Sequence, residues 1–82
     1  PEEGRFFLQD LLGLTVMDAD DGTVYGKLTD VIPTGANDVY EITTPEGKAL
    51  LAPAIPQVVV ETDVAGGSLR IRPLKGLFDD AD

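Results

Sequence analysis

Pairs of turn-forming residues divide the chain into short segments, and this spacing limits its fold more than any other feature. The segments between the pairs are rich in Val, Ile, Leu, Thr and Tyr, most of which favour strands. Short strands at regular spacing are typical of a small all-β sandwich or barrel. The pairs are Asp21-Gly22, Thr34-Gly35, Asn37-Asp38, Glu46-Gly47 and Gly66-Gly67. We expect strands at Leu14–Asp18, Val24–Ile32, Asp38–Thr43, Lys48–Ala52, Val58–Thr62 and Ser68–Arg72.

Single residues refine this prediction. Gly26 lies inside the longest segment, where a glycine predicts a β-bulge or a sharp bend. Pro33 ends that segment because proline has no backbone N–H to donate to a sheet. The period-2 alternation is clearest in the last segment, where Leu69 and Ile71 are expected to face inward and the arginines outward.

Two segments near the ends of the chain have helical rather than strand character. In FFLQDLLG, apolar residues recur at i and i+4, which predicts a short helical turn near residues 8–12 that Gly13 ends. The final residues, 74–82, predict a second turn at the C-terminus that packs Leu77 and Phe78 onto the barrel. The opening residues, PEEGR, have no initiating Met and resemble a linker, so we expect a fragment of a longer protein.

The chain offers few residues for catalysis or metal binding. It has no His and no Cys, which excludes imidazole and thiolate chemistry. The acidic run DADDG at 18–22 does not fit a calcium loop when Gly22 is placed sixth, so it predicts a hairpin turn. Asp30 and Asp38 flank a turn and form a candidate acid–base pair, but such carboxylates are usually solvated or capping groups. We therefore expect no enzyme activity and no cofactor.

The charge of the chain is strongly negative. Six basic residues face fifteen acidic ones, for a net charge of −9. Nucleic-acid binding is not expected, because phosphate contacts need clustered Lys and Arg. A basic protein is the natural electrostatic complement, and the alternative is that acidity only maintains solubility. No segment approaches the ~20 apolar residues that span a membrane, so no membrane partner is expected.

Four runs identify a family by their order and spacing. They are DLLGLTVMD at 10–18, TGANDVY at 34–40, LLAPAIPQVVV at 50–60 and KGLFDD at 75–80. Together they resemble the C-terminal PRC-barrel domain of the RimM family of ribosome maturation factors. The resemblance implies a single PRC-barrel domain at 6–80, preceded by a linker at 1–5 from a missing N-terminal domain and followed by a tail at 81–82.

The resemblance also implies a function. It suggests a cytoplasmic, non-catalytic adaptor for ribosome assembly and 16S rRNA processing. The implied partner is the small, basic ribosomal protein S19, bound while the head of the small (30S) ribosomal subunit matures. The full-length protein would associate with the 30S subunit, and this domain alone would not bind nucleic acid. The alternative is a generic PRC-barrel module for protein interaction or self-association.

Two places in the sequence are candidate binding sites under this resemblance. The family carries two adjacent aromatic residues, often Tyr-Tyr, before the run that reads DLLGLTVMD in this chain. Here the aromatic pair is Phe6-Phe7. In an extended segment the two side chains point in opposite directions, so one could pack on the barrel and the other face a partner. Alternatively, both complete the core. The TGANDV run either presents residues to a partner or is a purely structural turn. The candidate residues are Phe6, Phe7, Leu12, Asn37, Asp38 and Tyr40.

Overall fold

The computed structural model describes residues 6–74 and has one short helix and six strands in that range. These are α1 (Leu8–Leu11), β1 (Thr15–Asp18), β2 (Val24–Ile32), β3 (Val39–Thr43), β4 (Ala49–Pro53), β5 (Val59–Asp63) and β6 (Ser68–Ile71). All six predicted strands are present, with ends within one residue of those expected. The helical turn predicted near residues 8–12 is confirmed as α1. The predicted C-terminal turn and the boundaries proposed at 1–5 and 81–82 lie outside the described residues.

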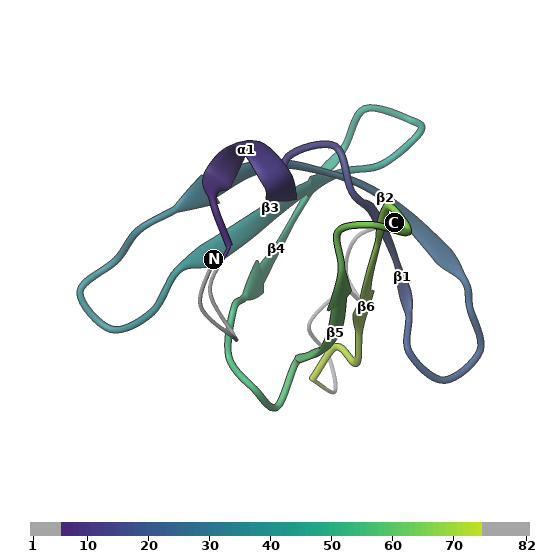
Figure 1. Cartoon of the computed structure of the whole chain (residues 1–82). Helices are drawn as coiled ribbons and strands as arrows, with labels where there is room; N and C mark the ends of the chain where they lie inside the picture. The colour runs from purple at the N-terminus through teal and green to yellow at the C-terminus, as the bar shows by residue number, and fades with distance from the viewer. Residues whose placement is uncertain (1–5, 75–82) are drawn as a thin grey trace.

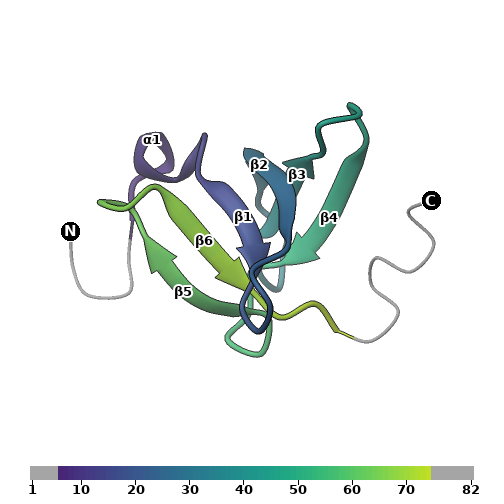
Figure 2. The same cartoon turned by 90° about the vertical axis from the view of Figure 1, so that its right-hand side faces the viewer.

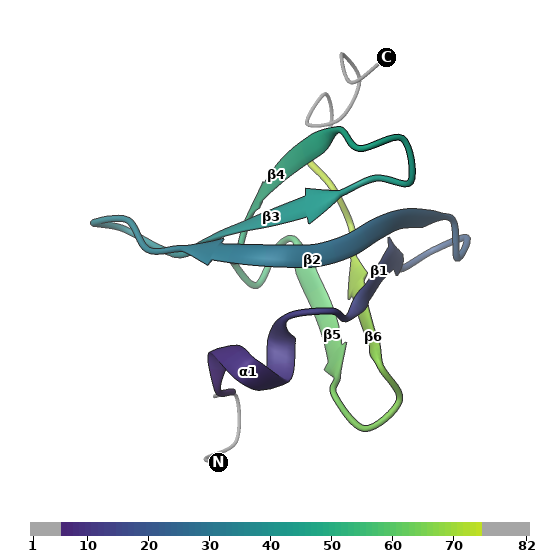
Figure 3. The ribbon, with the colours of Figure 1, turned by 90° about the horizontal axis from the view of Figure 1, so that it is seen from above.

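The strands form one curled sheet in the order β4-β3-β2-β1-β6-β5 (Figure 1). β1 and β6 are parallel, and the other neighbouring pairs are antiparallel. Seen from above, the long β2–β3 hairpin crosses β5 and β6 at a steep angle (Figure 3). The predicted all-β, barrel-like fold is therefore confirmed. The sheet is not closed, because β4 and β5 end the strand order without pairing with each other.

The bend that curls the sheet lies at Gly26, as the sequence predicted. The pairing of β1 with β2 shifts register between Val16 and Met17, beside the position where Gly26 pairs with Val16. A Cβ atom at Gly26 would lie 2.1 Å from the carbonyl oxygen of Thr43. Only a residue without a side chain allows β2 and the end of β3 to approach this closely.

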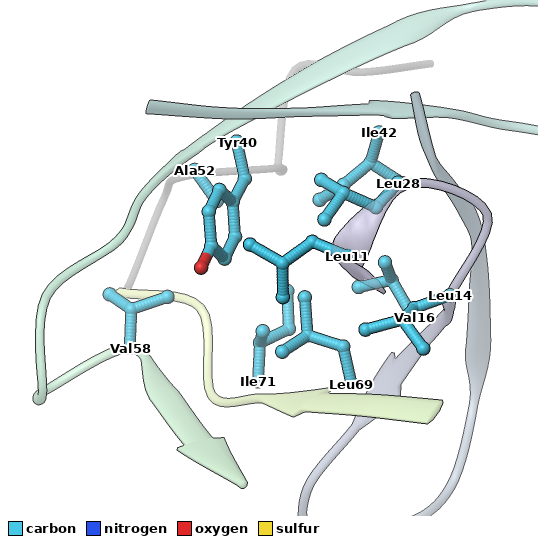
Figure 4. Close-up of a cluster of buried hydrophobic side chains, with 10 residues drawn as sticks. All are labelled: Leu11, Leu14, Val16, Leu28, Tyr40, Ile42, Ala52, Val58, Leu69 and Ile71. Carbon is cyan, nitrogen blue, oxygen red and sulfur yellow. The ribbon is translucent and has the colours of Figure 1, made fainter. Parts of the chain in front are cut away.

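Ten buried residues fill the inside of the curled sheet (Figure 4). They come from both halves of the sheet and from α1, and they are Leu11, Leu14, Val16, Leu28, Tyr40, Ile42, Ala52, Val58, Leu69 and Ile71. The alternation predicted for the last strand is confirmed, since Leu69 and Ile71 are fully buried. The two arginines of that segment form ion pairs on the outside.

Helix α1 is held by the barrel rather than by its own sequence. It has four residues and no side-chain hydrogen bond at its N-terminal cap, so it would not be stable alone. Leu11 inserts into the core, and the backbone N–H of Gly13 donates to the carbonyl of Leu28 at 2.8 Å. Gly13 has a φ of +94°, which ends the helix and turns the chain into β1. As a result, α1 lies against one end of the curled sheet (Figure 2).

The close approach at Gly26 makes a testable prediction about stability. Gly26→Ala should lower the free energy of unfolding by about 1–3 kcal/mol, because the new methyl group forces the backbone of β2 away from Thr43. Gly35→Ala is the matched control, since a Cβ there meets nothing within 4 Å. It should change stability by less than about 0.5 kcal/mol. Urea unfolding of the two variants measures this, and equal effects would show that the barrel does not depend on this contact.

Candidate functional site

Apolar side chains stay exposed around α1 because a single helical turn can bury only one of its sides. Leu11 is the residue that enters the core, while Phe7, Leu8 and Leu12 are exposed, and we call these three the α1 surface. Phe7 is the most open of them, with 59% of its surface exposed. The predicted alternative in which both phenylalanines complete the core is therefore wrong.

Phe6 is also exposed, at 39% of its surface, but it lines a groove. The groove has a volume of about 440 Å³. We call it the β5 groove, and it is lined by Phe6, Tyr40, Ala54, Ile55, Pro56 and residues 59–62 of β5. It therefore lies at the opening between the two ends of the curled sheet. The segment before α1 is extended at Phe7, as expected for two neighbouring aromatic residues that serve different surfaces.

Tyr40 connects the core with the β5 groove. Its ring is buried among the core residues, and it also lines the groove. In Figure 4 its hydroxyl oxygen points toward the end of the core where Val58 lies. Burial raises the pKa of Tyr40, and the nearby carboxylate of Asp38 raises it further. The hydroxyl is therefore protonated at neutral pH and can donate a hydrogen bond.

The TGANDV run is a turn, as predicted, but Thr34 organises it. The Thr34 hydroxyl accepts hydrogen bonds from the backbone N–H groups of Ala36 and Asn37 and donates to the carbonyl of Asn37. Gly35 forms this turn without a positive φ, since the described glycines with positive φ lie elsewhere. The Asn37 amide donates to the carbonyl of Asp38 at 2.9 Å, and the same carbonyl accepts from Ala54 N–H at 2.8 Å. The turn is thereby tied to the segment that lines the β5 groove.

The DADDG run also forms the predicted hairpin turn. One oxygen of Asp18 accepts from the N–H groups of Asp20 and Asp21, at 2.9 and 3.0 Å, and the other accepts from the Tyr25 hydroxyl at 2.7 Å. Asp20 forms a two-point ion pair with Arg72, with contacts of 2.8 and 3.1 Å. These carboxylates are already engaged within the fold. Within residues 6–74, no three acidic, His or Cys side chains gather where they could hold a metal ion.

The six candidate binding residues thus separate into three places. Phe6 and Tyr40 meet in the β5 groove, with Asp38 close to Tyr40. Phe7 and Leu12 belong to the α1 surface. Asn37 turns its amide back onto its own loop. The acid–base pair considered from the sequence does not form, because the register places Asp30 opposite Glu41 rather than Asp38.

Comparison with known families agrees with this architecture. The family model of the RimM PRC barrel domain matches residues 8–77. The chain belongs to the RimM family. It is 42% identical over 79 residues to the ribosome maturation factor RimM of Oleidesulfovibrio alaskensis, which covers 95% of this chain and 45% of that protein. It is 39% identical over 75 residues to the RimM of Lactobacillus delbrueckii subsp. bulgaricus, covering 92% of this chain and 45% of that protein.

A solved structure of the RimM family shares the fold. The crystal structure of a 16S ribosomal RNA processing protein RimM from Pseudomonas aeruginosa superposes with a TM-score of 0.76 and 26% sequence identity. The match covers 92% of this chain and 49% of the other. This RimM-family chain therefore spans about half the length of the relatives it matches. The one helix within residues 6–74, α1, lacks the length and apolar character to cross a membrane.

Sequence reasoning missed most residues of the β5 groove. Ile55 and Pro56 belong to a segment that the sequence showed only as an irregular stretch between two prolines. Val60 was assigned to a strand, but nothing in the sequence indicated that its side chain would stay exposed. The one signal in the sequence is the pair Pro53 and Pro56, because proline interrupts strand pairing and so indicates that the chain leaves the sheet there.

The Asp18 carboxylate gives a prediction about pH. The Tyr25 hydroxyl and the backbone N–H groups of Asp21 and Asp20 hold the pKa of Asp18 below its ordinary value of 3.8. A depressed pKa stabilises the fold above the unfolded-state pKa, and this stabilisation is lost as the pH falls through the folded-state pKa. Tyr25→Phe removes the largest cause and should raise the pKa of Asp18. NMR titration of the carboxyl carbon measures this shift.

The control for this titration is Tyr40→Phe, which removes a tyrosine hydroxyl that does not bond to Asp18. It should leave the pKa of Asp18 unchanged. If the pKa stays equally low in Tyr25→Phe, the backbone N–H groups of the turn alone hold it down.

Proposed function

We propose that this chain is the C-terminal PRC-barrel domain of a ribosome maturation factor that takes part in 16S rRNA processing. It is a non-catalytic adaptor of the cytoplasm that binds the basic ribosomal protein S19 while the head of the small (30S) ribosomal subunit matures. Support comes from the relatives, which are named ribosome maturation factors, and from the structural neighbour, which is named a 16S ribosomal RNA processing protein. The full-length protein associates with the 30S subunit.

One observation carries this proposal: a strongly acidic domain keeps an apolar surface open to solvent. The net charge is −9, and Phe7 and Leu12 of the α1 surface are exposed. Acidic side chains attract a basic protein over a distance and raise its association rate. Exposed aromatic residues supply most of the affinity once two proteins are in contact. The two features together suit a small basic protein as the partner.

The distribution of basic residues argues against direct nucleic-acid binding by this domain. Arg72 is held by Asp20 at 2.8 Å, and Arg70 lies 3.6 Å from Glu61. Lys27 donates to the hydroxyl of Thr15 on the neighbouring strand. These cations are therefore separate and partly neutralised, whereas phosphate binding needs a continuous basic patch.

Binding to S19 should depend on salt and on Phe7. In calorimetric titrations of this chain with purified S19, raising the salt concentration should weaken binding, because screening removes the attraction between opposite charges. Phe7→Ala should weaken binding by about tenfold, which is typical of an aromatic anchor. Val24→Ala is the matched control, since Val24 is also an exposed apolar residue but lies on β2, outside the α1 surface. It should bind like the unchanged chain.

Two results would contradict this proposal. No binding of S19 at either salt concentration would exclude S19 as a direct partner of this domain. A stable dimer in sedimentation, together with no affinity for S19, would favour the self-association module. The free edges of β4 and β5 are the observation that makes this second function worth testing.

A further inference from the structure

Within residues 6–74, no strand pairs with the outer edge of β5, and an apolar groove lies beside this free edge. β5 pairs with β6 on one side and ends the strand order on the other. A free edge presents backbone N–H and C=O groups to which an extended segment of another chain can add. Residues 59–62 of this edge also line the β5 groove. The backbone N–H of Val59 already donates to the carbonyl of Ile55 at 2.8 Å, so backbone pairing is available from Val60 onward, directly beside the groove.

The side chains of β5 suit such an added strand. The pairing with β6 shifts register between Val59 and Glu61, so Val60 lies in an irregularity of the strand. Val59 packs against the core, whereas 46% of the surface of Val60 is exposed. The groove of about 440 Å³ is small for a binding site, near the lower end of the ~300–1,000 Å³ of ligand pockets. It has room for a single large side chain rather than for a folded domain.

The charge around the groove points to the kind of segment. Glu61 lines the groove, and the carboxylate of Asp38 is close enough to raise the pKa of Tyr40. Arg70 lies 3.6 Å from Glu61, and both side chains are largely open to water, so this ion pair is weak and can exchange. A Lys or Arg of the added segment complements these carboxylates.

The edge at β4 lacks this combination. Leu51 of β4 is as exposed as Val60, with 51% of its surface open. However, no residue of β4 lines the β5 groove. An extended segment that added to β4 would gain backbone hydrogen bonds but no place for a large apolar side chain. The edge at β4 is therefore the natural internal control.

We propose that an extended segment of the basic partner adds as a strand to the free edge of β5. One large apolar side chain of that segment occupies the β5 groove between Phe6, Tyr40 and Val60, and a neighbouring Lys or Arg pairs with Glu61. This inference rests on the proposed function and deepens it, because it states how the basic protein docks. It assigns the groove to the partner's side chain and the α1 surface to a flanking contact.

Amide hydrogen exchange tests this docking directly. Exchange of single amides is followed by NMR in the isotope-labelled 82-residue chain, with and without purified S19. Amides of residues 60–63 that are open in the free chain should exchange about tenfold more slowly when S19 is at ten times its dissociation constant. Amides of residues 49–52 that are open to solvent should keep their rates.

A pair of variants provides a second readout. Val60→Ala should weaken S19 binding by about tenfold, because it removes an apolar contact at the rim of the groove. Leu51→Ala removes a similarly exposed side chain from the other edge and should leave the affinity unchanged. Urea unfolding of both variants confirms that they fold.

The outcomes separate this inference from the proposed function. Binding of S19 in calorimetry with unchanged exchange at β5 overturns the docking mode and leaves the proposed function standing. Slower exchange at β5 as the chain alone is concentrated means that a second copy occupies the edge, which also overturns it. Absence of S19 binding overturns the proposed function, and the inference falls with it.

Discussion

The close approach of β2 to the end of β3 at Gly26 is the constraint on which the rest of the structure depends. Because no side chain separates Gly26 from the carbonyl of Thr43, β2 can approach the end of β3 closely beside its register shift, which allows the sheet to curl. Curling brings Leu28 and Ile42 of one half of the sheet against Leu69 and Ile71 of the other. A flat sheet of the same strands would leave these side chains on one open face.

The curl stops short of closure, and the candidate site follows from this. β4 and β5 end the strand order, and the segment between them lines the β5 groove instead of extending the sheet. The carbonyl of Asp38, at the end of the turn between β2 and β3, holds that segment through Ala54. The TGANDV turn therefore has a structural role that also shapes the surface near Tyr40. A structural and a functional reading of this turn are compatible.

Under the proposed function, charge and apolar exposure act at different stages of binding. Some of its acidic groups are engaged within the fold, as Asp18 is with Tyr25 and the turn N–H groups. The remaining negative charge would attract a basic partner without specifying where it docks. In the proposed docking, the position comes from the α1 surface and the β5 groove, where apolar side chains stay open. A barrel with a small core and one short helix cannot cover these residues, since its surface is large relative to its volume.

The sequence by itself determined the number and limits of the strands, the turn at Asp18–Gly22, the bend at Gly26 and the family. The strands, the turn and the bend are local properties, because strand propensity, turn chemistry and the absence of a side chain act within a few residues, whereas the family follows from the order and spacing of four runs. The tertiary structure decided which side chains stay exposed. Phe6 and Phe7 are chemically identical neighbours and both are exposed, yet only Phe6 lines the groove. The groove itself joins residues from the segment before α1, from β3, from the β4–β5 connection and from β5, and only the path of the whole chain brings them together. Burial depends on what lies opposite a side chain, which no local pattern records.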